Sequence, residues 1–193
     1  MNNLLILILF AIMAVNCNFK NSIDKSSNKK NDDIKNVEIV TYPSICGQFF
    51  LHNKDTMLTL FDDVTGYLVM NDAPLLPYVN VINDDKSELL RLFYYPGDAY
   101  NDFSYFEISY LKNSFIEGSK FISSNCKKFV TENKIELGVT KNYLIQIKGQ
   151  KYKSEIKEGY ECLSYIGPDL YKEEYFFNNS SQLVKFGFGD LYP

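Results

Sequence analysis

Four strand-like segments separated by turn-forming residues dominate the sequence after residue 150. They are rich in aromatic and β-branched residues and cover 152–156, 161–166, 171–177 and 183–188. The residues between them are turn formers such as Gly, Pro, Asp, Asn and Ser. Short strands joined by tight turns pair most simply with their neighbours in the sequence. The pattern therefore predicts an antiparallel meander.

A short helix is predicted just before these strands. Thr140 is a favourable N-cap, because its hydroxyl can accept a hydrogen bond from the first turn. Tyr143, Leu144 and Ile147 are expected to share one face, and Gly149 stands where a left-handed C-cap is wanted. A helix this short is not stable alone in water, so its apolar face is expected to pack on the meander.

The end of the chain resembles a known family in the order of these features. Gly138-Val139-Thr140, a helix with Leu144 and Ile147, Gly149, and strands ending in 183–186 resemble the SmpA/OmlA family of small outer-membrane lipoproteins. The same residues are similar to the related fold of β-lactamase-inhibitor proteins. The resemblance covers about the last third of the chain. It implies helices on one face of a curved antiparallel sheet and a role in protein-protein contact rather than catalysis.

The first residues predict export. The apolar run from Leu4 to Val15 is too short to cross a bilayer, which takes about 20 residues, but it fits the core of a secretory signal. Ala14-Val15-Asn16-Cys17 resembles a relaxed lipobox, in which the cysteine becomes the lipidated first residue. We expect a signal peptide at 1–16 and a lipid on Cys17. The alternative is an ordinary signal peptide cleaved near Cys17.

Residues 17–36 are expected to form the lipidated cysteine and a disordered tether. Phe19, Ile23 and Ile34 are the large apolar residues of 18–36, too few to offset the entropy lost on ordering. The alternative is that the lysines of this segment bind anionic headgroups, although its aspartates partly cancel them. A flexible spacer would hold the folded part away from the lipid surface.

The remainder is expected to be α+β and mostly antiparallel β. We divide it into a β-rich subdomain at 37–133 and an SmpA/OmlA-like α+β subdomain at 134–193. Strand-like runs in the first part are 37–42, 48–52, 56–61, 66–70, 78–82, 88–95 and 104–111, with a hairpin turn at 53–55. A strand and a loop are expected within 114–130.

The charge of the chain argues against a nucleic-acid partner. The formal net charge is −4, and five of the 20 basic residues lie in the tether. Arg91 is the single arginine of the sequence. Phosphate contacts need a cationic surface, which this composition does not supply.

Catalytic and metal motifs are not found in the sequence. His52 is the only histidine; as a general base it could serve Cys46 or a serine, but its expected hairpin position favours a structural or surface role. There is no Gly-x-Ser-x-Gly elbow, HExxH, paired CxxC or glycine-rich phosphate loop. We therefore expect no catalytic residue, no cofactor and no bound metal.

Three pairs of adjacent acids are a second catalytic candidate. They are Asp62-Asp63, Asp84-Asp85 and Glu173-Glu174. A glycosidase needs two carboxylates that face each other, whereas neighbours on a strand point to opposite faces. The pairs are therefore expected to belong to turns or solvated edges.

One loop has the composition of a ligand-binding segment. Residues 94–103 interleave aromatic residues with Asp and Asn, which can stack on and hydrogen-bond to a sugar or a protein. The candidate ligand-binding residues are Tyr94, Tyr95, Tyr100 and Asp102. The alternative is that the tyrosines are strand ends that cover the core, and this interpretation is preferred.

Three cysteines remain if Cys17 is lipidated. An oxidising compartment would favour one disulfide among Cys46, Cys126 and Cys162, with one thiol left over. The spacing does not say which two pair.

The sequence thus predicts an exported lipoprotein, anchored to the bilayer through Cys17. It would lie in the cell envelope, most simply at the outer membrane, facing the periplasm or the exterior. Its task would be non-catalytic binding or envelope assembly through a protein partner. The alternatives are a secreted inhibitor or immunity-type protein, a glycan-binding module, and an enzyme.

Overall fold

The computed structural model describes residues 43–61, 64–69, 76–94, 102–114 and 120–190. These residues all belong to one compact unit. The signal peptide, Cys17, the tether and the strand expected at 37–42 lie outside the described residues. So do Asp62-Asp63, Tyr95 and Tyr100.

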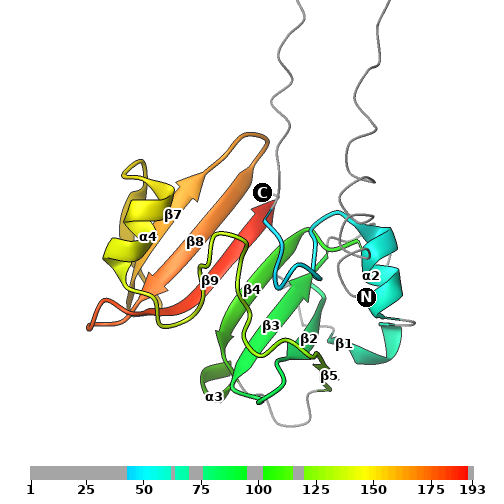
Figure 1. Cartoon of the computed structure of the whole chain (residues 1–193). Helices are drawn as coiled ribbons and strands as arrows, with labels where there is room; N and C mark the ends of the chain where they lie inside the picture. Colours follow the sequence, from blue (N-terminus) through cyan, green and yellow to red (C-terminus); the bar gives the residue numbers. More distant parts are fainter. Residues whose placement is uncertain (1–42, 62–63, 70–75, 95–101, 115–119, 191–193) are drawn as a thin grey trace, which may run out of the picture. The chain divides into compact units, whose positions relative to one another are not determined.

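A single sheet is built from two meanders (Figure 1). The first comprises β1 Leu68–Val69, β2 Tyr78–Ile82, β3 Glu88–Phe93 and β4 Tyr105–Tyr110, and the second comprises β6 Lys153–Lys157, β7 Tyr160–Ile166, β8 Tyr171–Phe177 and β9 Leu183–Asp190. Neighbouring strands within each meander are antiparallel, and β4 pairs with β9 antiparallel to join the two. The expected class, α+β and mostly antiparallel β, is confirmed. This one sheet contains strands from both sides of residue 133, where we divided the chain into two subdomains.

The helix expected before the second meander is α4, Lys141–Lys148. Thr140 Oγ1 accepts from the backbone N-H of Tyr143 at 3.2 Å, and Gly149 ends the helix at φ 86°. Leu144 is fully buried, as expected, but the side chain of Tyr143 is exposed. Adjacent residues on a helix lie about 100° apart. The narrow contact with the sheet therefore buries Leu144 and leaves Tyr143 outside.

A second helix occupies a segment for which the sequence predicted a strand. α2 covers Lys54–Leu60, so the predicted strand at 56–61 and the hairpin turn at 53–55 are wrong. Asn53 is the helix N-cap, and its side chain accepts from Thr56 N at 3.1 Å. A strand was predicted because 56–61 contains β-branched and aromatic residues, although the sequence also has two features that favour a helix. These were the Asn cap and the four-residue spacing of Met57 and Phe61, which are both buried.

Other segments of the first half follow the predicted ranges closely or in part. β2 lies at the predicted 78–82, and β3 and β4 fall within the predicted 88–95 and 104–111. The expected strand at 48–52 is reduced to an isolated bridge between Ile45 and Phe49. The run at 66–70 yields a 3-10 turn, Thr65–Tyr67, and the two-residue β1. Within 114–130, β5, Ile122–Ser123, pairs with β2 in parallel. A short helix, α3 Leu111–Ser114, follows β4.

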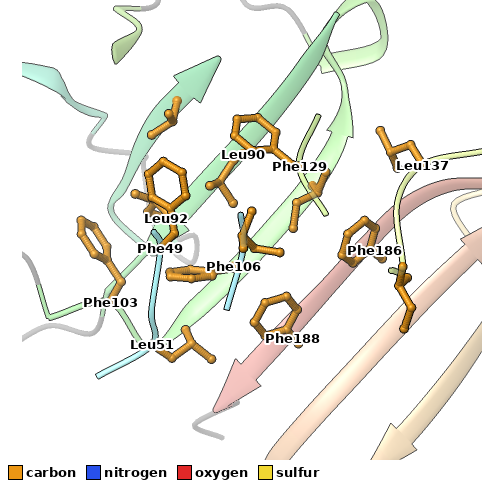
Figure 2. Packing of buried hydrophobic residues seen from close by; sticks show 14 of the residues in the cluster. Phe49, Leu51, Leu90, Leu92, Phe103, Phe106, Phe129, Leu137, Phe186 and Phe188 are labelled. Carbon is orange, nitrogen blue, oxygen red and sulfur yellow. The ribbon is translucent and has the colours of Figure 1, made fainter. Parts of the chain in front are cut away.

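One face of the sheet, which we call the core face, carries the hydrophobic core. Alternate residues of the central strands point into it, among them Leu90, Phe106, Phe186 and Phe188. Irregular segments bring further side chains onto the same face, such as Phe49 and Phe129, which meet edge to face at 6.1 Å (Figure 2). Leu144 of α4 and Met57 of α2 belong to the same cluster. The core is thus the sheet on one side and the helices and coil segments on the other.

Candidate functional site

The opposite side of the sheet carries charged side chains in the middle of its strands. Residues paired directly across strands share a face, so the strand register defines which residues lie there. We call this the charged face, and its defining residues are Tyr78, Arg91, Phe93, Tyr105, Glu107, Lys157, Lys172, Glu174, Phe176 and Lys185. The buried side chains of α2 and α4 belong to the core cluster, so neither helix packs on the charged face.

Glu107 is the centre of one ion-pair network. Its Oε1 accepts from Arg91 Nη1 at 3.0 Å, and its Oε2 lies 3.5 Å from Lys185 Nζ. Lys185 in turn reaches Glu158 at 2.8 Å. The side chains of Arg91, Glu107 and Lys185 are each 18–19% exposed. The network therefore ties β3, β4 and β9 together at a surface that still contacts solvent.

Glu174 is the centre of a second network. Lys157 Nζ and Lys172 Nζ both lie 2.7 Å from its Oε1, and Lys157 also pairs with Glu155 at 2.9 Å. Burial acts to raise the pKa of Glu174, but the two lysines outweigh it, so the pKa is lowered. Hydrogen bonds to Glu174 and then Glu155 raise the pKa of Lys157. These groups are therefore charged at neutral pH.

Aromatic rings form a row beside the charges. The rings of Tyr78 and Phe93 are 5.3 Å apart, and those of Phe93 and Tyr105 are 5.9 Å apart. The guanidinium of Arg91 lies 5.4 Å from the centre of the Tyr78 ring, a cation-π geometry. The row crosses β2, β3 and β4 at the positions where the strands are paired.

A glycine on β9 lets the last ring of this row lie against the sheet. A Cβ at Gly187 would overlap the hydroxyl of Tyr105 and come within 2.8 Å of the carbonyl oxygen of Phe106. Burial raises the pKa of the Tyr105 phenol well above its ordinary value. Farther along, Lys185 Nζ lies 4.4 Å from the centre of the Phe176 ring, which is buried. The ammonium group of Lys185 therefore lies over the Phe176 ring, a cation-π geometry.

The aromatic residues and the arginine of the charged face are residue types that protein interfaces favour. Tyr, Phe and Arg are enriched in protein interfaces, because they combine apolar area with directed polar groups. The register also places Ser109, Cys162 and Ser164 on this side of the sheet, and all three are buried. Its charged groups already pair with one another, so a ligand would exchange these contacts for its own.

His52 lies at a different place, beside two aspartates. Its Nε2 is 2.9 Å from Asp190 Oδ2, and its Nδ1 is 3.5 Å from Asp102 Oδ1. The hydrogen bond from His52 N to Phe103 O, at 3.0 Å, fixes the backbone here. His52 thus bridges two acids rather than lying in a hairpin. Both ring nitrogens of His52 therefore face a carboxylate.

The loop proposed to bind a ligand is described only at its ends. Tyr94 is 5% exposed, and its ring meets Phe103 edge to face at 6.0 Å. Tyr94 is therefore a core residue, which agrees with the preferred interpretation of that tyrosine. Asp102 is partly exposed beside His52.

The adjacent acids point to opposite sides where they lie on a strand. Glu173 is buried on the core face, where it accepts from Tyr171 Oη at 3.0 Å and Tyr175 Oη at 2.8 Å and pairs with Lys148 of α4 at 2.7 Å. Glu174 belongs to the charged face. Asp84-Asp85 lies in the turn between β2 and β3, where Asp85 accepts from Ser87 N. Neither described pair forms a two-carboxylate site.

The three described cysteines are free thiols. Cys46 Sγ lies 3.0 Å from Lys128 O and Cys126 Sγ lies 3.9 Å from Gln48 Oε1, so the segments of these two cysteines meet, whereas Cys162 is buried on β7 with Ser164 Oγ at 3.8 Å. Burial raises the pKa of Cys162. The structure thus brings two of the three expected disulfide candidates together.

The charged face was not among the sites predicted from the sequence. Its signal was a charged residue inside each of several apolar strands: Arg91 in ELLRLF, Glu107 in YFEISY and Lys185 in LVKFGFGD. Each charge taken alone resembles a solvated strand position. Only the register shows that they meet.

We compared the chain with known protein families, proteins and structures. No protein-family model, no curated protein and no solved structure matches the chain. Within the described ranges, no three His, Cys, Asp or Glu side chains gather as a metal site. Each helix in that part of the chain is too short or too polar to cross a bilayer.

Proposed function

We propose that this chain is an exported lipoprotein, anchored through Cys17, whose charged face binds a protein of the cell envelope. The role is non-catalytic. The observation that carries the binding part is the charged face, because its charged groups are partly exposed, it combines aromatic residues with Arg91, and neither α2 nor α4 packs on it.

The residues of this face would offer a partner protein both contact area and charged groups that orient it. The guanidinium of Arg91 is already held over the buried ring of Tyr78, so little conformational entropy is lost when a partner covers Arg91. The charged groups are 13–34% exposed, which leaves them within reach of opposite charges on a partner. Complementary charges of this kind govern association rate and specificity more than affinity.

The anchor is supported by the sequence. The apolar run that ends before Cys17 and the polar segment at 18–36 are what a tethered lipoprotein needs.

The division of the folded part into two subdomains belongs to the same proposal. In it, 37–133 is a β-rich subdomain, and 134–193 is the SmpA/OmlA-like unit in which a short helix packs on a meander.

Photocrosslinking inside cells tests the binding surface. A photoreactive side chain at Lys172, on the charged face, is expected to capture one envelope protein reproducibly. The matched control carries the same group at Lys127, an exposed lysine on a coil segment after β5. Equal capture at both positions, or no reproducible protein at Lys172, would contradict a protein partner on this face.

The anchor is tested by a separate arm of the same experiment. Cys17→Ala should release the protein from the membrane fraction and reduce capture at Lys172, because a tethered protein has a high local concentration of its partner. A variant that stays in the membrane fraction with unchanged capture would contradict the lipid anchor but leave the binding face standing.

A further inference from the structure

Cys46 and Cys126 are far apart in the sequence but meet in the fold. Cys46 Sγ lies 3.0 Å from the carbonyl oxygen of Lys128, two residues after Cys126, and Cys126 Sγ lies 3.9 Å from Oε1 of Gln48, two residues after Cys46. Each thiol therefore contacts the segment that carries the other. A disulfide requires a specific, short separation of the two side chains.

The backbone holds the two cysteine-bearing segments together on both sides of the pair. Cys46 N donates to Val130 O at 2.8 Å, and Ile45 forms a bridge with Thr131. On the other side, Gln48 Nε2 donates to Asn125 Oδ1 at 3.2 Å. The arrangement exists without a covalent bond, so closing one would distort the fold little.

The two thiols also differ in reactivity. The hydrogen bond with Cys46, assisted by Ser124, lowers the pKa of Cys126 to about 7 despite its burial. The same hydrogen bond raises the pKa of Cys46, and burial adds to it. Cys126 is therefore the thiol of the two that loses its proton more readily, and the thiolate is the nucleophilic form of a cysteine.

Cys162 is excluded by its place in the sheet. The carbonyl oxygen of Cys126 accepts from Asp84 N, just after β2, while Cys162 is on β7. The order β2-β3-β4-β9-β8-β7 separates them by five strand spacings, roughly 24 Å at about 4.8 Å each. That is several times the reach of a disulfide.

We propose that Cys46 and Cys126 form an intramolecular disulfide that fastens the segment at 43–52 to the segment at 124–131. The oxidant class is a disulfide such as glutathione disulfide. One cysteine thiolate attacks a sulfur of the oxidant, which releases one glutathione thiolate and leaves a mixed disulfide. The second cysteine loses its proton, and its sulfur displaces the other glutathione. The protein loses two electrons and two protons, and the oxidant becomes two thiols.

Peptide mapping tests the pairing directly. The full chain is equilibrated in glutathione buffers of rising oxidised fraction, free thiols are alkylated, and the digest is read by mass spectrometry. A peptide pair linked through Cys46 and Cys126 is expected, with Cys162 alkylated. Cys162→Ser is the matched control and should give the same linked pair. A link through Cys162, or alkylation of both Cys46 and Cys126 at every ratio, would overturn the proposal.

Thermal unfolding tests the fastening. The oxidised protein should unfold roughly 10 °C above the reduced protein, because the bond closes a long loop of the unfolded chain. Cys162→Ser should keep this difference, and Cys46→Ser should abolish it. Equal midpoints for oxidised and reduced wild type would overturn the fastening, whether or not Cys46→Ser folds.

The proposal shares with the proposed function only the expectation of an oxidising compartment. Its tests use the purified chain in a defined redox buffer, so they do not depend on Cys17, a membrane or a partner. Failure of the disulfide and failure of the binding face are therefore distinguishable.

Discussion

The core face and the charged face are two sides of the same strands, and they hide their side chains in different ways. On the core face, Phe186 is covered by side chains from outside the sheet as well as by its neighbours (Figure 2). On the charged face, Phe176 is also buried, yet the recorded contact above it is the flexible end of Lys185. Equal burial therefore does not mean equal packing. Helices and coil segments cover the core face, whereas Phe176 on the charged face lies beneath a lysine side chain.

Removing one phenylalanine from each face should give the largest effect and the clearest contrast. Phe186→Ala is expected to cost about 3–5 kcal/mol of unfolding free energy, because the rigid core cannot close the cavity. Phe176→Ala should cost about 1–2 kcal/mol, since Lys185 can fold over the gap. Urea unfolding followed by circular dichroism measures both. Similar losses would mean that the two faces are packed alike.

The helix that covers the core face gives the next test. Leu144→Ala should cost about 2–5 kcal/mol, because Leu144 is fully buried between α4 and the sheet. Tyr143→Ala changes the adjacent residue, which is exposed, and should stay within about 0.5 kcal/mol of wild type. An unchanged unfolding midpoint for Leu144→Ala would remove α4 from the core.

A smaller effect should appear in the pH dependence of stability, which should differ between the carboxyl groups of Glu174 and Glu88. The pKa of Glu174 is lowered from 4.5 in the folded state, so its contribution is present above that pKa and is lost as pH falls through the folded value. Burial raises the pKa of Glu88, whose carboxylate accepts from Phe129 N at 2.7 Å. Its contribution has the opposite sign: it is present below the unfolded pKa and is lost as pH rises through the folded one.

Glu174→Gln should therefore lower the free energy of unfolding at pH 7, whereas Glu88→Gln should not. Glu174→Gln is expected to lose about 1 kcal/mol and to flatten the loss of stability on acidification. Glu88→Gln keeps an acceptor for Phe129 N and should be as stable as wild type or more so. Denaturant unfolding from pH 4 to pH 8 measures both slopes. Parallel slopes for the two variants would contradict the assignment.

The second meander could be predicted because its signals are local. Turn formers separate its strands, and Thr140 and Gly149 mark both ends of α4. The first half was predicted less well for a physical reason. Residues 56–61 have strand-like composition, yet the Asn53 cap and the burial of Met57 favour a helix. Tertiary packing decided between two weak local preferences.

The candidate site could not be predicted, because its residues are brought together only by the way the strands pair. Arg91 and Glu107 are on neighbouring strands, but Lys185 joins them only through the pairing of β4 with β9. The meeting of Cys46 with Cys126 depends on coil segments that carry no periodic pattern. Long-range pairing of this kind leaves no mark on the spacing of single residues.

The pairing of β4 with β9 also sets an order in time. A ribosome makes β4 before β5, β6, β7 and β8, and the strand that pairs with β4 on its other side follows only after all of them. Until β9 arrives, the first meander has an open strand edge, and open edges invite association with other chains. The sheet therefore closes only after β5, β6, β7 and β8 have been made, and the nascent chain has an open edge at the centre of its sheet throughout that interval.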